Sequence, residues 1–529
     1  MDDSETKAAA LEEPAAPAVN GVITSAIDLS HHLNLSSRSR HPSPLKEIIK
    51  YMAYDGMVSL AGGLPHPSLF PIHNASFSVS APNPKEGNIE LQISNNPTST
   101  PPLSKFLQYG NCTGNAELRQ WCLEFTQQIH RPAYKDYDVL LHPGNTNAWC
   151  KVVGLLCEKG DYILCESYTY PSAQALWIPN ENFAAPIAMD GEGIMNKSLE
   201  ETLESWDSTH PGVNRPHVLY LVSVGSNPTG VSMSAERRKQ VYNICVRYDV
   251  IIVEDDPYFF LQYPEFDLSA TSTEYKAASN DEYLSSLIPS FLHVDYQGRV
   301  IRLESFSKTL APGLRLGYFV ANPLFTERLL RATEVETQDP SGVSQALVLS
   351  LLASWTTSGY ITWLQNLRLE YQRRRDWMTA AIKELFDLSP ASQFPELRAE
   401  GLVAAIEGSA GTRTPIFSFI PPTGGMFLWT KFYFAQNGKY QVIKNSKQEI
   451  DPEQAFANKL WSELAEEKVL LTPGYYYHPW QGAQKTSTSA RGADPDTSHF
   501  RLTFAMTTKE DMELGIERLA KVVRRSWSS

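Results

Sequence analysis

The sequence predicts an α/β protein in which a mostly parallel sheet is sandwiched by helices and accompanied by a smaller α+β domain. Between about residues 105 and 335, short continuous apolar runs alternate with amphipathic segments. Such runs are typical of parallel strands that are covered on both faces. After residue 340 come long helical stretches and then a β segment marked by Gly and Pro. The 529 residues, 42% of them hydrophobic and 20% charged, are enough for a large globular core.

Six apolar runs are the expected strands of the main sheet. Between the third and the fourth, Ser234 can cap a helix whose apolar residues recur every three to four positions. In an open sheet of this kind, ligands bind beyond the carboxyl ends of the strands. The six runs are DVLLH (138–142), YILCE (162–166), HVLYLVSV (217–224), DVIIVEDD (249–256), RVIRLES (299–305) and RLGYFVAN (315–322).

The second domain is predicted from two helical stretches, 344–355 and 361–386, the β segment PPTGGMFLWTKF (421–432) and a last helix near 508–525. Two polar segments are predicted as an insertion or long loop (80–102) and as a mobile loop (481–498). The predicted organisation is a disordered acidic tail (1–40), an N-terminal arm with part of the small domain (41–104), a large cofactor-binding domain (105–345) and a C-terminal small domain (346–529).

Charge and composition exclude several classes of protein. The formal charge of −13 argues against binding nucleic acid or an anionic membrane. No apolar run approaches the ~18 residues of a membrane helix. The six cysteines form no C-x-x-C pair, so we expect reduced thiols and no metal site. The acidic start lacks the features of signal and transit peptides, and a cytoplasmic location is expected.

Lys308 is the first candidate for chemistry. It lies in ESFSKTLAPGLRLGYF (304–319), after an expected strand, among hydroxyl side chains and little other charge. A solvated surface lysine is the ordinary alternative. Schiff-base chemistry needs a neutral amine, which desolvation and nearby cations provide. Ser305, Ser307 and Arg315 would suit a phosphate ester.

Three further motifs follow expected strands, and each has an ordinary alternative. SNPTG (226–230) is a common turn, which recurs nearly unchanged as NNPTS (95–99). EDDPY (254–258) could be a solvated acidic strand end. The glycine of HPGNTNAW (142–149) could belong to a plain turn, although backbone N–H groups at a helix start can also bind an anion.

Together these motifs resemble the class I and II aminotransferases, the fold-type-I family that depends on pyridoxal 5′-phosphate (PLP). The signature S-x-S-K, followed by an Arg and then L-G-Y, carries the resemblance, and the other motifs occur in the family's order. The resemblance implies a PLP-dependent transferase fold of type I, PLP as cofactor, and a homodimer with shared active sites.

By this resemblance Lys308 binds the cofactor covalently and shuttles the proton. Asp255 pairs with the pyridine nitrogen, because the family spacing Asp-x-x-Tyr selects it over Asp256. The position after a strand selects Asn227 over Asn96. The other implied residues are Asn145, Thr146, Ser305, Ser307 and Arg315 at the phosphate, Tyr109 at the phosphate of the neighbouring subunit, Tyr170 on the ring face with Tyr168 as its competitor, Tyr258 with Asn227 at the phenolic oxygen, and Arg501 with Asn227 on the substrate α-carboxylate.

The N-terminal segments point to a branch of the family. SLAGGLPHPSLFP (59–71) resembles the aminoadipate/kynurenine group, and residues 28–46 resemble its fungal aromatic-amino-acid members. In this group Gly62 and Gly63 let the arm lie close to the substrate. Lys46 occupies the position at which relatives often carry a cation that helps to bind the distal carboxylate of a substrate. The run Tyr475, Tyr476 and Tyr477 could line an aromatic pocket or belong to the core and rim.

The implied activity is a ping-pong transfer of the amino group of an aromatic amino acid to a 2-oxo acid, with 2-oxoglutarate as the expected acceptor. The alternatives are a 2-aminoadipate or kynurenine aminotransferase, a PLP lyase or decarboxylase, and a PLP-sensing regulator. A regulator would need a basic winged-helix module, and residues 1–40 are too short and too acidic to supply one.

Overall fold

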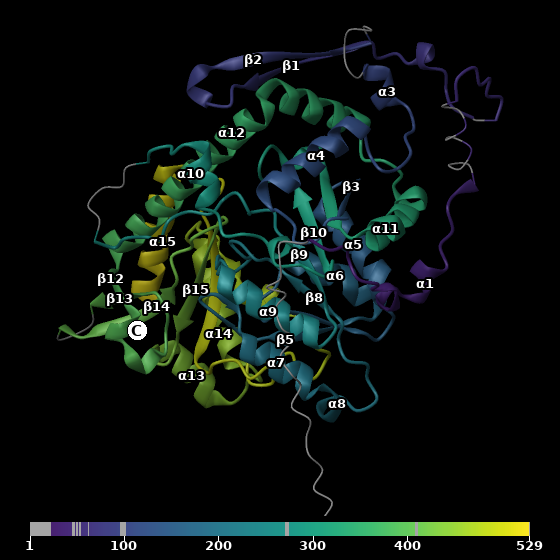
Figure 1. Ribbon diagram of the computed structural model, residues 1–529. Helices are drawn as coiled ribbons and strands as arrows, with labels where there is room; N and C mark the ends of the chain where they lie inside the picture. Colours follow the sequence, from purple (N-terminus) through teal and green to yellow (C-terminus); the bar gives the residue numbers. More distant parts are fainter. Residues whose placement is uncertain are drawn as a thin grey trace, which may run out of the picture.

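A computed structural model of the chain describes residues 23–44, 48, 51, 54–61, 63–95, 102–269, 275–407 and 411–527. The described residues form a large α/β domain, a smaller α+β domain and an N-terminal arm with a β-hairpin (Figure 1). Among the described helices, none has both the length and the apolar character of a membrane span.

The large domain is built on a seven-stranded sheet of order β3-β11-β10-β9-β8-β4-β5. Only β11 runs against its neighbours, and the other paired strands are parallel. The predicted mostly parallel sheet is therefore confirmed. Its strands are β3 (Asp138–His142), β4 (Tyr162–Glu166), β5 (Phe183–Ile187), β8 (Val218–Leu221), β9 (Ile251–Asp255), β10 (Val300–Ser305) and β11 (Gly317–Ala321).

Both faces of this sheet are buried, which explains why its strands are continuously apolar. Along β9, Ile251 and Val253 join one hydrophobic core, whereas Ile252 joins the core of the opposite face. Helices α1 (Leu35–Arg38), α5 (Asn145–Leu156), α6 (Pro171–Trp177) and α11 (Pro323–Glu336) flank the first face, and α4 (Ala116–Ile129), α7 (Asn196–Glu204), α8 (Trp206–Thr209), α9 (Ala235–Arg247) and α10 (Asn280–Ser285) lie on the other.

The small domain contains a six-stranded antiparallel sheet of order β12-β13-β14-β15-β17-β16. Helix α15 packs along it together with the end of α12 (Figure 1). The strands are β12 (Asp387–Pro390), β13 (Leu402–Glu407), β14 (Arg413–Phe419), β15 (Phe427–Tyr433), β16 (Thr472–Pro473) and β17 (Thr497–Thr503), and the helices are α13 (Gly438–Ser446), α14 (Pro452–Glu466) and α15 (Lys509–Trp527).

Helix α12 (Gly342–Leu385) crosses from one domain to the other, with a break at Thr356. Leu352 and Leu364 belong to the core of the large domain, whereas Ile382 belongs to that of the small domain. The predicted boundary at residue 345 therefore falls inside a helix, because an apolar period alone does not tell which core a helix face meets.

The structure corrects two expectations about polar segments. The expected loop 80–102 contains the strand β2 (Asn88–Ser94), which pairs with β1 (Asn74–Ser80) and packs on α12 near α3 (Leu103–Leu107). Within the expected tail, residues 23–40 are folded, and Leu29 and Leu33 are buried in the large-domain core. Both were missed because isolated apolar residues in polar surroundings carry little periodic signal.

The polar segment 481–498 contains no named helix or strand until β17 begins at Thr497. It is nevertheless attached to the small domain by Thr488, whose backbone N–H donates to the Asp451 carboxylate over 2.6 Å. The hydroxyl of Thr488 also donates to this carboxylate, over 3.0 Å. Asp451 caps α14, so the loop is held at a helix start.

The two domains meet at a close backbone contact. Gly225 has a φ of 53°, and a Cβ there would collide with the backbone of Gly425. Next to it, the backbone N–H of Tyr263 donates to Thr423 over 2.7 Å, and that of Gly425 donates to Leu261 over 3.0 Å. This contact brings the start of β15 against the loop that follows β8.

We expect Gly225→Ala to destabilise the protein by more than the ~1–2 kcal/mol of left-handed backbone strain, because the added methyl also separates the two domains. Gly212→Ala is the matched control, since Gly212 has a φ of 80° and open space around it. Thermal unfolding of both variants tests this. Equal losses of stability would contradict the role given to the Gly225–Gly425 contact.

Candidate active site

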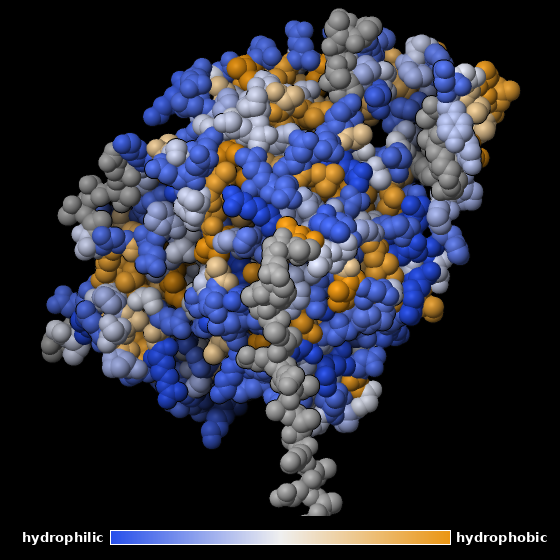
Figure 2. Space-filling view, viewed as in Figure 1, coloured by the Kyte–Doolittle hydropathy of each residue, from blue (hydrophilic) through white to orange (hydrophobic). Residues whose placement is uncertain are grey.

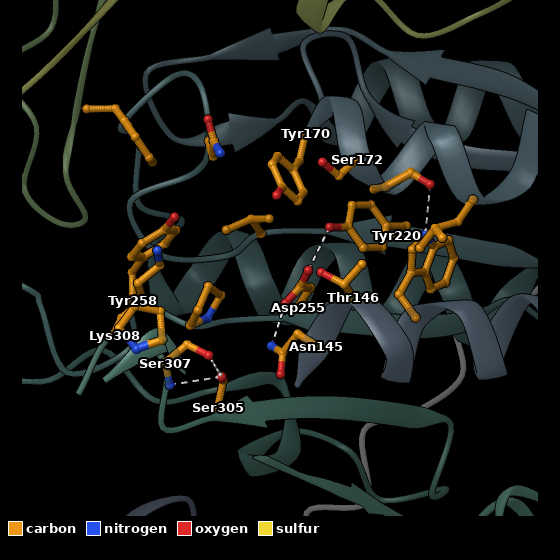
Figure 3. Close-up of a pocket in the computed structure, with 18 of the residues that line it drawn as sticks. Asn145, Thr146, Tyr170, Ser172, Tyr220, Asp255, Tyr258, Ser305, Ser307 and Lys308 are labelled. Atoms are coloured by element: carbon orange, nitrogen blue, oxygen red, sulfur yellow. Dashed lines mark hydrogen bonds between the residues drawn. The ribbon is translucent and has the colours of Figure 1, made fainter. Parts of the chain in front are cut away.

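A cavity of about 310 Å³ lies beyond the carboxyl ends of β8, β9 and β10, where ligands of an open α/β sheet bind. Residues of both domains line it, and Figure 3 draws most of them as sticks. Eleven of the predicted site residues line this cavity, namely Asn145, Thr146, Tyr170, Asn227, Asp255, Tyr258, Ser305, Ser307, Lys308, Arg315 and Arg501.

One end of the cavity is suited to bind a phosphate. Helix α5 begins there after Gly144, so its free N–H groups and positive dipole end face the space. A Cβ at Gly144 would collide with the Arg315 guanidinium, which therefore rests against the bare backbone. Arg315 also donates to the Ser307 hydroxyl over 3.4 Å, and Ser305 donates to Ser307 over 2.9 Å. These groups supply cationic and hydroxyl donors around one point.

Asp255 lies at the other end of the cavity, and it is 8% exposed. Burial raises the pKa of this carboxyl, whereas hydrogen bonds from Asn145 and Tyr220 favour its charged form. The Asn145 amide donates to Oδ1 and the Tyr220 hydroxyl to Oδ2, each over 2.7 Å (Figure 3). A carboxylate so placed can pair with a protonated ring nitrogen.

The side-chain alternation along β9 separates Asp255 from Asp256. Successive side chains of a strand point to opposite faces, so Asp255 shares the α5 face with Val253. Asp256 points to the other face, where the Ser223 hydroxyl donates to it over 3.1 Å and Arg302 lies 3.3 Å away. The structure thus places Asp255 in the cavity wall and Asp256 outside it.

Lys308 follows β10 and is half-buried at the cavity wall. Burial lowers the pKa of its amine, and the cations Arg315 and Arg501 lower it further. In the described part of the chain, none of these three cations forms an ion pair with a carboxylate. A lysine in this setting is neutral at lower pH than a solvated one, as a nucleophile or base requires.

Arg501 comes from β17 of the small domain and reaches across to the large domain. Its Nη1 donates to Asn227 Oδ1 over 2.7 Å. Its guanidinium lies 4.3 Å from the centre of the Phe427 ring and 5.2 Å from that of Tyr477. Burial lowers the pKa of Arg501, and its Nη2 donates to the Thr472 hydroxyl over 3.4 Å. Its Nε has no hydrogen-bond partner among the described residues. Asn96, the alternative to Asn227, lies outside the described residues.

The structure also decides between the aromatic candidates. Tyr170 lines the cavity, whereas Tyr168 packs against Trp429 and His499 away from it. Tyr258 is buried at the cavity wall, and burial raises the pKa of its hydroxyl, which therefore stays protonated.

Of the run 475–477, Tyr477 is 2% exposed and lies beside Arg501, whereas Tyr476 is 48% exposed. These two tyrosines represent the core and the rim, so the run as a whole does not line an aromatic pocket.

Two predicted residues of the described chain, Tyr109 and Gly63, do not line this cavity. Tyr109 is 60% exposed and lies near Asp339 in a separate hollow. Gly63 is exposed in the arm, with open space where a Cβ would stand. Lys46 and Gly62 lie outside the described residues.

Several lining residues were missed from the sequence, above all Tyr220 and Phe427. Tyr220 sits inside the apolar run of β8 and reads as an ordinary core residue. Its position two residues after Val218 puts it on the α5 face together with Asp255, and this alternation is the signal that could have found it.

Known proteins resemble the chain over most of its length. The family profile "Aminotransferase class I and II" matches residues 103–519. The chain belongs to the class I and II aminotransferases. As an aminotransferase it is an enzyme, and the predicted fold of this family is confirmed.

Individual aminotransferases support the assignment. An aromatic amino acid aminotransferase of Schizosaccharomyces pombe is 36% identical over 94% of this chain and 98% of its own length. An L-tyrosine:2-oxoglutarate aminotransferase of Serpula lacrymans is 34% identical over 87% of this chain and 85% of its own. The crystal structure of aminotransferase Aro8 from Candida albicans matches with a TM-score of 0.83 and 34% identity, over 96% of this chain and 100% of that one.

We expect Gly144→Ala to weaken binding of inorganic phosphate by about tenfold or more, because the new methyl displaces Arg315 from the α5 N-terminus. The dissociation constant can be read from the rise in melting temperature with phosphate concentration. Gly160→Ala is the matched control, since Gly160 has a φ of 91° and open space around it. Unchanged phosphate binding in Gly144→Ala would refute the anion site.

Proposed function

We propose that this aminotransferase binds PLP in the 310 Å³ cavity and transfers the amino group of an aromatic amino acid to a 2-oxo acid, with 2-oxoglutarate as acceptor. The single observation that carries the proposal is that Lys308, a phosphate cup and a buried carboxylate line one cavity. The names of its relatives support the aromatic donor and the acceptor.

The residues present fit the cofactor at two separate points, its phosphate and its ring nitrogen. Ser305, Ser307, Arg315 and the α5 N-terminus would hold the phosphate, and the bare backbone at Gly144 leaves room for Arg315 beside it. Asp255 would pair with the ring nitrogen. When bound, PLP supplies an electron sink for the electron pair that remains when a substrate loses its Cα proton.

Proton transfer and substrate binding depend on side chains of the protein. Lys308 Nζ, whose pKa is lowered by burial, can accept the proton from the substrate Cα and return it. Arg501 would clamp the substrate α-carboxylate through both arms of its fork, with Asn227 orienting it. Tyr258 and Asn227 would donate to the phenolic oxygen of the cofactor, and Tyr170 would cover its ring. An amino donor and an oxo acid acceptor would use this one site in turn.

A homodimer is part of the proposal. The arm exposes apolar side chains that a second copy could cover, at the upper right of Figure 2, among them Val58 (81% exposed), Leu60 (97%) and Leu69 (77%). Tyr109 is exposed and far from its own cavity, which suits a residue that completes the partner's phosphate site. We also propose that the protein is located in the cytoplasm.

The proposed activity is tested with a panel of amino donors (Phe, Tyr, Trp, 2-aminoadipate, kynurenine and Asp) against 2-oxoglutarate. We expect aromatic donors to give the highest kcat/KM, and Lys308→Ala to abolish multiple turnover and to change the visible absorbance of the PLP-loaded protein. A preference for 2-aminoadipate or kynurenine would favour the alternative function, a 2-aminoadipate or kynurenine aminotransferase. A bovine kynurenine/α-aminoadipate aminotransferase is 28% identical over 94% of this chain. Full activity of Lys308→Ala would refute the assignment of this lysine.

For Arg501→Lys we expect the KM of the amino donor to rise by about ten- to a hundredfold, because lysine keeps the charge but loses the two-pronged hydrogen bonding. The retained charge should leave the pKa of Lys308 low, so the pH dependence of kcat should change little. Steady-state kinetics over a pH series measure both. Arg215→Lys, at a surface ion pair with Asp207, is the control. An unchanged KM would remove Arg501 from substrate binding.

A further inference from the structure

Asp255 is held by two neutral donors that come from different parts of the large domain. Asn145 is the first residue of α5, and Tyr220 lies on β8. Each gives one hydrogen bond of 2.7 Å, and each uses a different carboxylate oxygen. The carboxylate is therefore fixed in both position and rotation before any ligand enters the cavity (Figure 3).

The Asn145 amide is fixed by a second hydrogen bond. Its Nδ2 also donates to the Leu303 carbonyl of β10 over 2.9 Å. A flipped amide would set its oxygen against both acceptors, so only the observed orientation is compatible with the two contacts. Both side-chain N–H groups of Asn145 are thus used by Asp255 and β10. Only the backbone N–H of Asn145 is left to donate to a phosphate.

Tyr220 is equally well fixed. Its ring is fully buried and lies 4.6 Å from that of Trp149 and 6.2 Å from that of Trp177, measured between ring centres. Burial and the neighbouring Asp255 raise the pKa of its hydroxyl, so it acts as a donor at any working pH. This packing directs the hydroxyl of Tyr220 at Asp255 Oδ2, to which it donates.

We propose that Asn145 and Tyr220 are positioning residues that keep the Asp255 carboxylate ionised and aimed into the cavity. The inference rests on the proposed function, because an ionised Asp255 matters only if a protonated ring nitrogen binds beside it. Neither residue would touch the reacting atoms through its side chain. Their effect would pass through Asp255 alone.

The electrostatic setting of Asp255 explains why two donors are needed. Burial favours its neutral form, and hydrogen bonds to the charged form oppose this. The other ionisable groups that face it are Glu166 at the end of β4, Arg302 of β10 and Tyr258. Of these, only Arg302 favours the charged form, and it lies on the opposite face of the sheet in contact with Glu254 and Asp256.

Loss of either donor should therefore raise the pKa of Asp255. As pH falls through the raised value, the carboxylate becomes protonated and the ring nitrogen loses its partner. For Tyr220→Phe and Asn145→Leu we expect the acidic limb of the pH profile of kcat to move up by about one pH unit, with kcat at neutral pH lower by about tenfold. The KM of the amino donor, which Arg501 would set, should change little.

A readout independent of turnover is the dissociation constant of PLP from the apo-protein, followed by quenching of tryptophan fluorescence. We expect it to rise by about tenfold in both variants, and Asp255→Asn to set the upper limit of the effect. Tyr168→Phe is the matched control, because it also removes a buried hydroxyl but packs on Trp429 and does not touch Asp255.

The outcomes separate the two proposals. If the wild-type protein does not bind PLP, the proposed function fails. If it binds PLP and both variants behave like Tyr168→Phe in the pH profile and the dissociation constant, the function stands and the positioning role is refuted. Tyr220→Phe keeps the ring and its packing on Trp149, so it decides the question even if Asn145→Leu does not fold.

Discussion

The burial of charge at the carboxyl ends of β8, β9 and β10 is the constraint on which the site depends. Because strand side chains alternate, the two faces of the sheet treat this charge differently. On one face Arg302 lies 2.7 Å from Glu254 and 2.6 Å from Glu304, so buried charges compensate one another. On the other face Asp255 has only neutral hydrogen-bond donors. The Asp255 carboxylate faces the cavity, where a ligand can supply the opposite charge.

The cations of the cavity follow the same logic. In the described part of the chain, Lys308, Arg315 and Arg501 lie near one another without carboxylate partners, although the protein as a whole carries a charge of −13. Like charges this close repel one another, and an anion that binds among them removes this cost. The net charge therefore argues against nucleic acid as a partner but says nothing about small anionic ligands, for which the cavity offers both a phosphate cup and the Arg501 guanidinium.

The site also depends on how the two domains touch. Arg501 and Phe427 belong to the small domain, and they reach the cavity because Gly225 and Gly425 allow the two backbones to approach closely. Gly230 adds a second close contact, since a Cβ there would meet the carbonyl of Phe427. Helix α12, with its two ends in different cores, ties the domains together along their length.

The sequence by itself determined the fold class, the family and the order of the motifs, because apolar runs and short motifs are local patterns. It also selected Asp255, Asn227 and Lys308 through spacing and position after strands. Only the tertiary structure showed that Tyr220 and the Asn145 side chain hold Asp255, because these contacts join residues 35 and 110 positions apart. The tertiary structure also placed Tyr109 outside its own cavity and Leu29 in the core. A local sequence pattern predicts neither the exposure of a side chain nor its long-range packing.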